Sequence, residues 1–340
     1  TSSVIGEKLN KETYFFFIKH FIFVLISLFL IIFFSIQKKD KIIKFLTPLF
    51  VISILFLFLV PIIGVEIKGS KRWIDLLFLP RFQPIELVKP LFILFVAKII
   101  ILNDKMNIYN RYIYSFFILF LVAALLINQP DLGQGLLVTL SWLAMIFASG
   151  FNMIVLLVLG LLGVIFLFSL IYFLPSKFGY ISNRLLAFFN PKAGDNFQSQ
   201  KALDAIKQGG LTGQGMGEGI LKDKVPEAHT DYIIAVVSEE FGALFVLFIV
   251  IIFLFISYRV LNKVLKGNDE FLKLTLVGLI CQLSIQTFIH IGVNTRLLPT
   301  TGMTLPFLSY GGSSLIGSSL VAGIILNFTR KDSLRYLHNE

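Results

Sequence analysis

The stretch YFFFIKHFIFVLISLFLIIFFSI, residues 14–36, is followed closely by IIKFLTPLFVISILFLFLVPIIGV, residues 42–65. Each run exceeds the roughly 18 apolar residues that indicate a membrane-spanning helix. Open β-strands cannot span lipid, because their backbone groups would stay unpaired. The alternating pattern of an outer-membrane barrel is absent from the sequence. These two runs therefore predict an all-α membrane protein.

The whole chain has the same apolar character. Of its 340 residues, 56% are hydrophobic and 15% are charged, and the mean hydropathy is +0.85. A soluble domain carries about a quarter charged residues. The net charge of +10 would suggest a nucleic-acid partner in a soluble protein. Here the basic residues lie in short loops, so we interpret them as topology signals and contacts for anionic lipids, and we predict no nucleic-acid partner.

The apolar runs predict a polytopic protein with about nine transmembrane helices, within one domain that covers residues 1–340. A break at residues 129–131 could be a turn between two helices or a kink in one, and its turn chemistry favours the turn. The predicted spans are Tyr14–Ile36, Ile42–Val65, Pro84–Leu102, Tyr112–Ile127, Leu132–Ala148, Met153–Leu174, Tyr232–Ser257, Phe271–Val293 and Gly311–Phe328.

Lysine and arginine gather in four segments, which are residues 37–44, 103–111, 258–273 and the tail after Phe328. Nine spans place all four on one side, which should be the cytoplasm, together with the C-terminus. Thr1 would then lie outside, so we expect a further helix before it. The other side carries residues 175–230, a large and mostly polar extracytoplasmic loop. Loops of that length are usually functional or disordered.

The first polar motif consists of GSKRWID, residues 69–75, and RFQPIELVK, residues 81–89. Its tryptophan, at a membrane edge, could be an interfacial anchor. Glu86 and Lys89 have the spacing of an intrahelical pair. Charges embedded in an apolar helix are costly and typical of functional sites. Arg81 and Lys89 could also bind a diphosphate together, since arginine supplies a donor fork and lysine a point charge.

The second motif is PEAHTD, residues 226–231, directly before an apolar run. Asp231 or Thr230 could simply cap the following helix. Asp231 could instead be a carboxylate held at the membrane surface that acts as a general base. The residues alone leave both interpretations open. Glu239 and Glu240, further along the same run, must face protein or water, as a proton path or a polar packing site.

Two further segments are rich in glycine. The stretch GGLTGQGMGEG, residues 209–219, lacks the Gly-Lys-Ser/Thr of a nucleotide-binding loop. It predicts a flexible or tightly turned external loop. The stretch NTRLLPTTGMTLPFLSYGGSS, residues 294–314, breaks helix while remaining fairly apolar. Irregular backbone at membrane depth is tolerated only where it is buried or lines a cavity, so this stretch predicts a re-entrant segment or a cavity wall.

Six motifs in this order resemble the SEDS family, the FtsW/RodA proteins of bacterial cell-wall synthesis. The resemblance runs from about Ser2 to Lys331 and is closest to the division-type FtsW branch. Family members usually have ten helices, which implies that this chain starts just after the first. The motifs are GxxRWID at 69–75, QPxExxK at 83–89, QPDxG at 129–133, PEAHTD at 226–231, EEFG at 239–242 and LPFLSYGGS at 305–313.

The resemblance implies a peptidoglycan glycosyltransferase that polymerises lipid II, a disaccharide-peptide on undecaprenyl diphosphate, during septal cell-wall synthesis. The acceptor 4-hydroxyl attacks the anomeric carbon of the donor, and the lipid diphosphate leaves. In family terms Asp231 is the catalytic carboxylate that deprotonates this hydroxyl, while Arg81 and Lys89 bind or neutralise the diphosphate. The other residues that the resemblance places at the substrate are Trp73, Lys71, Arg72, Glu86, Asp131, His229, Asn294 and Ser309.

The resemblance also implies partners and a location. Family members work with a single-pass class B penicillin-binding protein, which supplies the transpeptidase, and with other membrane proteins of the division machinery. A divalent cation, Mg²⁺ or Mn²⁺, could share the neutralisation of the diphosphate, although the sequence shows no metal site. We expect a multi-pass protein of the bacterial cytoplasmic (inner) membrane with its active face outside.

Two other classes of function stay open. A lipid II flippase would use the membrane-embedded charges of Glu239, Glu240 and Lys89. A non-catalytic division scaffold would tolerate the loss of Asp231. The sequence places most polar motifs on the outer side, which favours chemistry at that surface.

Overall fold

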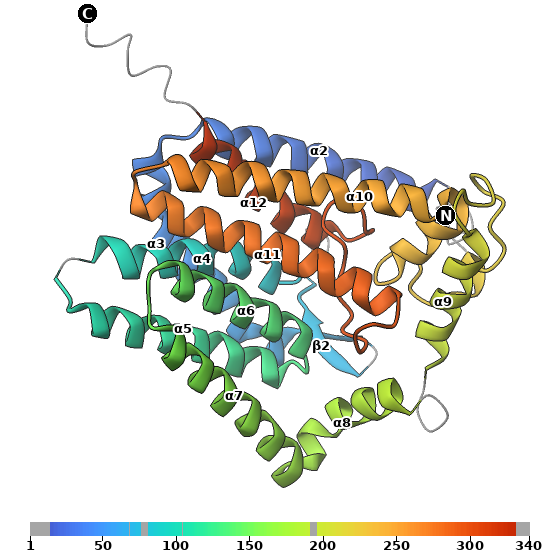
Figure 1. The fold of residues 1–340 in the computed structure, drawn as a ribbon, viewed down its shortest axis with the longest axis horizontal. Coiled ribbons are helices and arrows are strands. Elements are labelled where there is room, and N and C mark those ends of the chain that lie inside the picture. The colour runs from blue at the N-terminus through green and yellow to red at the C-terminus, as the bar shows by residue number, and fades with distance from the viewer. Residues whose placement is uncertain (1–13, 68, 76–80, 104, 191–195, 331–340) are drawn as a thin grey trace, which may run out of the picture.

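Long helices run side by side in this protein (Figure 1). The computed structural model describes residues 14–67, 69–75, 81–103, 105–190 and 196–330. A short antiparallel hairpin, β1 (Val65–Ile67) and β2 (Ser70–Trp73), joins α3 to α4. The helices are α2 (Phe15–Ile36), α3 (Lys39–Ile63), α4 (Ile85–Leu102), α5 (Ile108–Asn128), α6 (Leu132–Ala148), α7 (Met153–Phe173), α8 (Pro175–Phe189), α9 (Phe197–Gly209), the 3-10 helix η1 (Lys222–Lys224), α10 (Ile233–Lys266), α11 (Glu270–Asn294) and α12 (Gly312–Thr329).

Each predicted span overlaps a helix of the described chain, which confirms the all-α membrane class. Helix α10 continues to Lys266, so much of the segment 258–273 that was predicted as a loop is helical. Seven of these helices have the length and hydropathy of a membrane span. The other two are α6, with 17 residues, and α4, whose 18 residues include Glu86, Lys89 and Lys98. The number of membrane crossings therefore stays a prediction. Residues 129–131 form a turn between α5 and α6, as the turn chemistry predicted.

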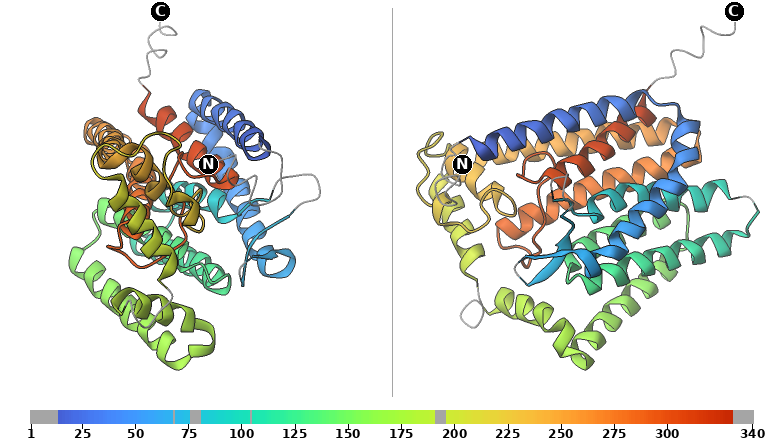
Figure 2. Two further views of the ribbon diagram at one scale, coloured as in Figure 1. Left: turned by 90° about the vertical axis from the view of Figure 1, so that its right-hand side faces the viewer. Right: turned by 180° about the vertical axis from the view of Figure 1, so that it is seen from behind.

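The basic segments predicted to share one side of the membrane share one end of the helical bundle (Figures 1 and 2). At this end Lys39, the first residue of α3, forms an ion pair with Asp269, which precedes α11. Asn327 of α12 donates to the carbonyl of Phe34 at the end of α2 (2.7 Å). The predicted positions of Thr1, Lys331 and Arg335 lie outside the described residues.

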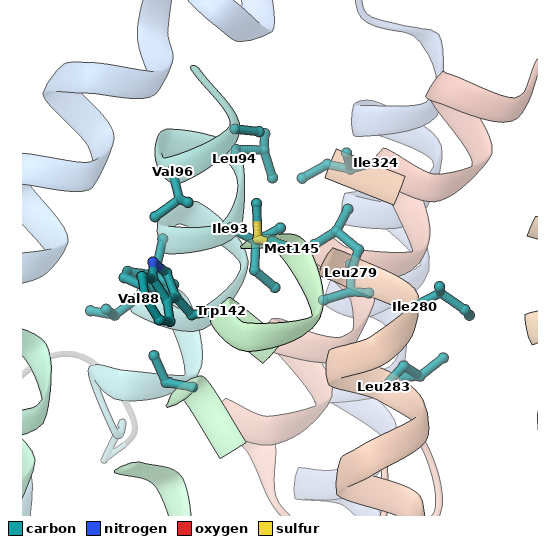
Figure 3. Close-up of a cluster of buried hydrophobic side chains, with 14 of the residues drawn as sticks. Val88, Ile93, Leu94, Val96, Trp142, Met145, Leu279, Ile280, Leu283 and Ile324 are labelled. Carbon is teal, nitrogen blue, oxygen red and sulfur yellow. The ribbon is translucent and has the colours of Figure 1, made fainter. Parts of the chain in front are cut away.

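Helix α4 lies in the middle of the bundle and packs against α3, α6, α11 and α12. Val88, Met145, Leu279 and Ile324 bring these elements together in the core (Figure 3). A Cβ at Gly278 of α11 would lie 2.5 Å from Ile93 Cγ2 and 2.7 Å from Met145 Sδ. The absence of a side chain at this position therefore lets α11 approach α4 and α6 closely, as small residues do between membrane helices.

The predicted extracytoplasmic loop at 175–230 contains defined structure, because α8, α9 and η1 lie within it. Its glycine-rich stretch was predicted to be either flexible or tightly turned, and it is tightly turned. Gly210, Gly213, Gly215 and Gly217 all have positive φ angles. We call residues 209–219 the glycine strap, and it contacts α10 at a break in that helix.

The break in α10 lies at Gly242, whose φ is 81° and ψ is 173°. A broken helix leaves backbone groups without their usual partners. The glycine strap supplies replacements on both sides of the break. Gln214 N–H donates to the Glu239 carbonyl (2.9 Å), and Ala243 N–H donates to the Gly210 carbonyl (2.9 Å). The strap and the two halves of α10 therefore form one hydrogen-bonded unit.

The two adjacent acids before the break have local partners. The Glu239 carboxylate is fully buried and accepts the backbone N–H groups of Leu221 (2.7 Å) and Lys222 (2.6 Å). Glu240 forms an ion pair with the Lys222 ammonium. Of the two interpretations from sequence, this arrangement matches the polar packing site.

Candidate functional site

A cavity of about 710 Å³ lies at the end of the bundle opposite the basic segments. The β1–β2 hairpin, α8 and the segments before α10 and α12 meet there, so its wall comes from segments that are distant in sequence. Its lining includes Arg72 and Trp73 of β2, Glu86 of α4, Gln134 of α6, Tyr180 and Arg184 of α8, Glu227 and Asp231 before α10, and Gly302 and Thr304 before α12.

Asp231 lies in the wall of this cavity, directly before α10. Tyr232 occupies the N-cap position of α10, and no side-chain cap hydrogen bond forms there. The Thr230 hydroxyl donates instead to Glu227 Oε2 (3.0 Å). Neither Asp231 nor Thr230 therefore occupies the N-cap position of α10. The carboxylate of Asp231 lies at the cavity.

Two predicted residues hold the backbone around Asp231 and do not line the cavity. Asn294 is fully buried, and its Nδ2 donates to the carbonyls of Asp231 (3.0 Å) and His290 (2.8 Å). The Ser309 hydroxyl donates to the Thr230 carbonyl (2.6 Å). Helix α11 and the segment before α12 thus fix the position of Asp231 through its backbone.

His229 lies next to this anchor. Its carbonyl accepts the backbone N–H of Tyr310 (2.8 Å), and its ring meets the Tyr310 ring edge to face at 5.8 Å. His229 is not a cavity-lining residue, whereas Tyr310 is. The structure therefore places His229 behind the wall.

Tyrosines in the wall stay protonated near neutral pH. Burial, together with the nearby Asp231 carboxylate, raises the pKa of Tyr232 to about 12. Burial also raises the pKa of Tyr180 and of Tyr310 above the usual value for a phenol. A group with such a pKa is a poor base at physiological pH. Carboxylates are the better candidates for accepting a proton in this cavity.

Arg72 is the first cation of the cavity wall. Its Nε donates to the Gln129 carbonyl (3.2 Å), and it also donates to the Pro130 carbonyl. Its Nε lies 3.7 Å from Asp131 Oδ2. Asp131 is buried behind it, and burial raises the pKa of this carboxyl against the opposing effect of Arg72. Asp131 therefore orients Arg72 and does not itself line the cavity.

Arg184 of α8 is the second cation, and sequence reasoning missed it. Its Nη1 donates to the Thr300 carbonyl (3.2 Å), and its guanidinium lies 5.8 Å from the Tyr180 ring centroid. Burial and the neighbouring Arg72 lower its pKa, while Asp231 raises it. An arginine has so high a pKa that it remains charged. The cavity thus combines two guanidinium groups with the Asp231 carboxylate.

The structure does not bring Arg81 and Lys89 together. Arg81 pairs with Asp75 (Nε to Oδ2, 2.8 Å) at a surface where its side chain is 56% exposed. Lys89 pairs with Glu86 (Nζ to Oε2, 2.9 Å), as the spacing predicted, and its side chain is 1% exposed. Neither lines the cavity, although Glu86 does.

The hairpin separates two more of the predicted residues. Trp73 lines the cavity from β2. Lys71, on the same strand, lies opposite Glu66 of β1. It is exposed and is not a cavity-lining residue. Residues two apart share a face of a regular strand, but an irregularity in the pairing opposite Val65 and Glu66 lies between Lys71 and Trp73 and gives them different surroundings.

Among the described residues, no group of three or more His, Cys, Asp and Glu side chains could hold a metal ion. The described residues alone therefore do not build a cation site.

One signal in the sequence could have revealed Arg184. Residues 175–189 form an amphipathic helix, in which Phe178 and Ile181 are buried. Apolar residues at this spacing predict a helix that lies against the protein. Treating residues 175–230 as one polar loop hid this helix and the basic residue on it.

Comparison with known proteins finds similar sequences over most of this chain. The family model FTSW_RODA_SPOVE, a cell cycle protein, matches residues 1–334. A probable peptidoglycan glycosyltransferase FtsW of Caulobacter vibrioides is 37% identical over 271 residues, which cover 80% of this chain and 68% of the relative. A probable peptidoglycan glycosyltransferase FtsW of Haemophilus ducreyi is 34% identical over 339 residues, which cover 97% and 84%.

Solved structures share the fold. A chain of a peptidoglycan synthase complex, solved to explain how polymerization and crosslinking are coordinated, matches with a TM-score of 0.75 and 25% identity. The match covers 96% of this chain and 91% of that chain. The rod shape determining protein RodA of Thermus thermophilus matches with a TM-score of 0.65 and 26% identity, over 91% of this chain and 85% of that chain.

Proposed function

Because this chain belongs to the FtsW/RodA/SpoVE family of cell cycle proteins, we propose that it uses Asp231 as the general base of a peptidoglycan glycosyltransferase that polymerises lipid II. It is a multi-pass membrane protein, and its relatives carry the name of this enzyme. The observation that carries the proposal for Asp231 is its place in the wall of a cavity that Arg72 and Arg184 also line.

The proposed reaction starts with the acceptor sugar in this cavity. Asp231 accepts the proton of the 4-hydroxyl while the oxygen attacks the anomeric carbon of the donor. The bond from that carbon to the diphosphate breaks, and undecaprenyl diphosphate leaves with the bonding electron pair. Glu86 is a weaker candidate for the base, because Lys89 already pairs with it.

Arg72 and Arg184 are the proposed ligands of the departing diphosphate. Negative charge grows on this group in the transition state, and preorganised cations at that place lower the barrier. Arginine suits the role because its planar fork can donate two hydrogen bonds to phosphate oxygens. The divalent cation of the sequence prediction stays a prediction, and no step of the proposed reaction is assigned to it.

The partner and the location are also proposals. The matched peptidoglycan synthase complex supports a partner that crosslinks glycan strands, for which a class B penicillin-binding protein is the expected class. The gathering of basic segments at one end of the bundle supports a cytoplasmic position for that end in the inner membrane. The cavity, at the opposite end, would then face the outside.

The function can be tested with the purified chain and its cognate penicillin-binding protein in vesicles. We expect labelled lipid II on the outer leaflet to be converted into glycan strands. A parallel measurement follows the movement of lipid II between leaflets. Polymerisation without translocation would support the enzyme. Translocation without polymerisation would support the flippase. Absence of both activities would support a non-catalytic scaffold.

Replacing Arg184 with Gln should lower kcat/KM for lipid II by about 10–100-fold, because a charge-assisted hydrogen bond to the diphosphate is lost. Polymerisation rates over a range of lipid II concentrations measure this effect. Lys207→Gln is the matched control, since Lys207 is an exposed basic residue of α9 that does not line the cavity. Equal effects of the two substitutions would contradict the assignment of Arg184.

A further inference from the structure

The buried pair Glu86 and Lys89 lies at the cavity wall, which Glu86 lines. The two side chains are 4% and 1% exposed, and Nζ lies 2.9 Å from Oε2. Glu86 reaches the cavity, whereas Lys89 does not. The other carboxylate oxygen, Glu86 Oε1, accepts a hydrogen bond from Gln134 Nε2 of α6 (3.2 Å). Lys89 is therefore turned toward protein groups and away from the space that the substrate would occupy.

A second contact of Lys89 leads toward Asp231. Lys89 Nζ donates to Gln286 Oε1 of α11 (3.3 Å), and Gln286 Nε2 donates to the Thr304 carbonyl (2.9 Å). Thr304 belongs to the segment 300–304, whose Thr300, Gly302 and Thr304 line the cavity. One chain of contacts thus links the ammonium to the cavity wall.

The segment 300–304 borders the carboxylate of the proposed base. Gly302 has a φ of 72°, and a Cβ built on it would lie 3.5 Å from Asp231 Oδ2. The positive φ favours glycine at this position, and the backbone of the segment passes within van der Waals reach of the Asp231 carboxylate. A small displacement of the segment would therefore change the space beside the carboxylate, and misplacement of about 1 Å can lower a rate about 100-fold.

We propose that Lys89 is a positioning residue, which neutralises Glu86 and holds the segment 300–304 beside Asp231 through Gln286. The inference rests on the proposed function, and it differs from a role for Lys89 as a ligand of the diphosphate. A buried charge is stable only with a partner. Loss of the ammonium would leave Glu86 as an uncompensated charge and free Gln286 from one of its two contacts.

The two roles predict different kinetics. A positioning residue affects the geometry at the reacting atoms, so its loss lowers kcat more than it changes KM. A diphosphate ligand also contributes to the binding of the donor, so its loss raises KM. Neutralising Glu86 together with Lys89 separates the roles further, because it removes the uncompensated charge but cannot restore a lost ligand.

The experiment uses the full chain with its penicillin-binding partner in vesicles and measures kcat and KM for lipid II. Lys89→Met should lower kcat by about 30-fold or more and change KM by less than about threefold. The double variant Glu86→Gln/Lys89→Met should recover about tenfold of that loss. Gln286→Leu, which leaves the ion pair between Glu86 and Lys89 intact, should lower kcat and leave KM unchanged. Melting temperatures of all variants show whether each one folds.

Lys98→Met is the matched control, because Lys98 lies on the same helix but contacts Thr47 of α3 (Nζ to Oγ1, 2.9 Å). Its activity should stay within about twofold of the wild type. The positioning role alone would be overturned if Lys89→Met raised KM without lowering kcat. It would also be overturned if the kcat of the double variant were no higher than that of Lys89→Met. If the wild type and Lys98→Met both failed to polymerise lipid II, this result would overturn the proposed function and this inference together.

Discussion

Asp231→Asn should abolish most polymerisation of lipid II, lowering kcat by about 10²–10⁴-fold. The amide keeps the size and most of the polarity of the side chain but cannot accept the proton of the attacking hydroxyl. The backbone of residue 231 should stay in place, since Asn294 Nδ2 binds its carbonyl and not its side chain. Glycan strand formation by the purified variant with its partner measures the effect.

The matched control for this substitution is Glu227→Gln. Glu227 is a second carboxylate in the same cavity wall and accepts the Thr230 hydroxyl. We expect its loss to lower the rate by less than about tenfold, because a hydrogen bond to a neighbour is weakened while the base remains. Turnover of Asp231→Asn near the wild-type rate would exclude Asp231 as the base. A larger loss in Glu227→Gln would move the assignment to Glu227.

Gly242→Ala should have the largest effect on stability, about 3 kcal/mol or more. Gly242 has a φ of 81°, and a Cβ there would overlap the Leu211 carbonyl oxygen and lie 2.5 Å from Gly213 N. Both neighbours are backbone atoms of the glycine strap, so neither can rotate away as a side chain would. The strap would have to separate from α10, with loss of its hydrogen bonds to Glu239 and Ala243.

Thermal unfolding of the detergent-solubilised protein measures this effect. Gly160→Ala is the control, since Gly160 lies in α7 and a Cβ there meets no heavy atom within 4 Å. That substitution should change the stability by less than about 0.5 kcal/mol. Equal melting temperatures for Gly242→Ala and the wild type would mean that the strap does not need to contact the break so closely.

Most of the fold could be predicted from sequence, for a simple physical reason. A backbone in lipid must satisfy its hydrogen bonds within one helix, so a long apolar run such as residues 14–36 has one stable form. The pairing of Glu86 with Lys89 was predictable for a similar reason, because residues three apart on a helix are neighbours. The motif ending at Asp231 likewise identified the candidate base.

The set of residues that line the cavity could not be predicted in this way. Arg81 was a candidate by its charge, yet it pairs with Asp75 at the surface. Arg184 lies more than a hundred residues away from Arg72 in sequence, and the packing of α8 and the hairpin brings both to one cavity. Nothing local in the sequence specifies such a distance between elements.

The sequence by itself determined the helices, the membrane class and a candidate carboxylate, because these depend on local hydrogen bonding, hydrophobicity and motif. Only the tertiary structure decided where that carboxylate lies and which residues share its cavity. Whether Asp231 caps α10 depends on where the helix begins, and it begins at Ile233. The packing of the β1–β2 hairpin, α8 and the segment before α10 at one end of the bundle decides which cations line the same cavity. Contacts between distant segments set those positions.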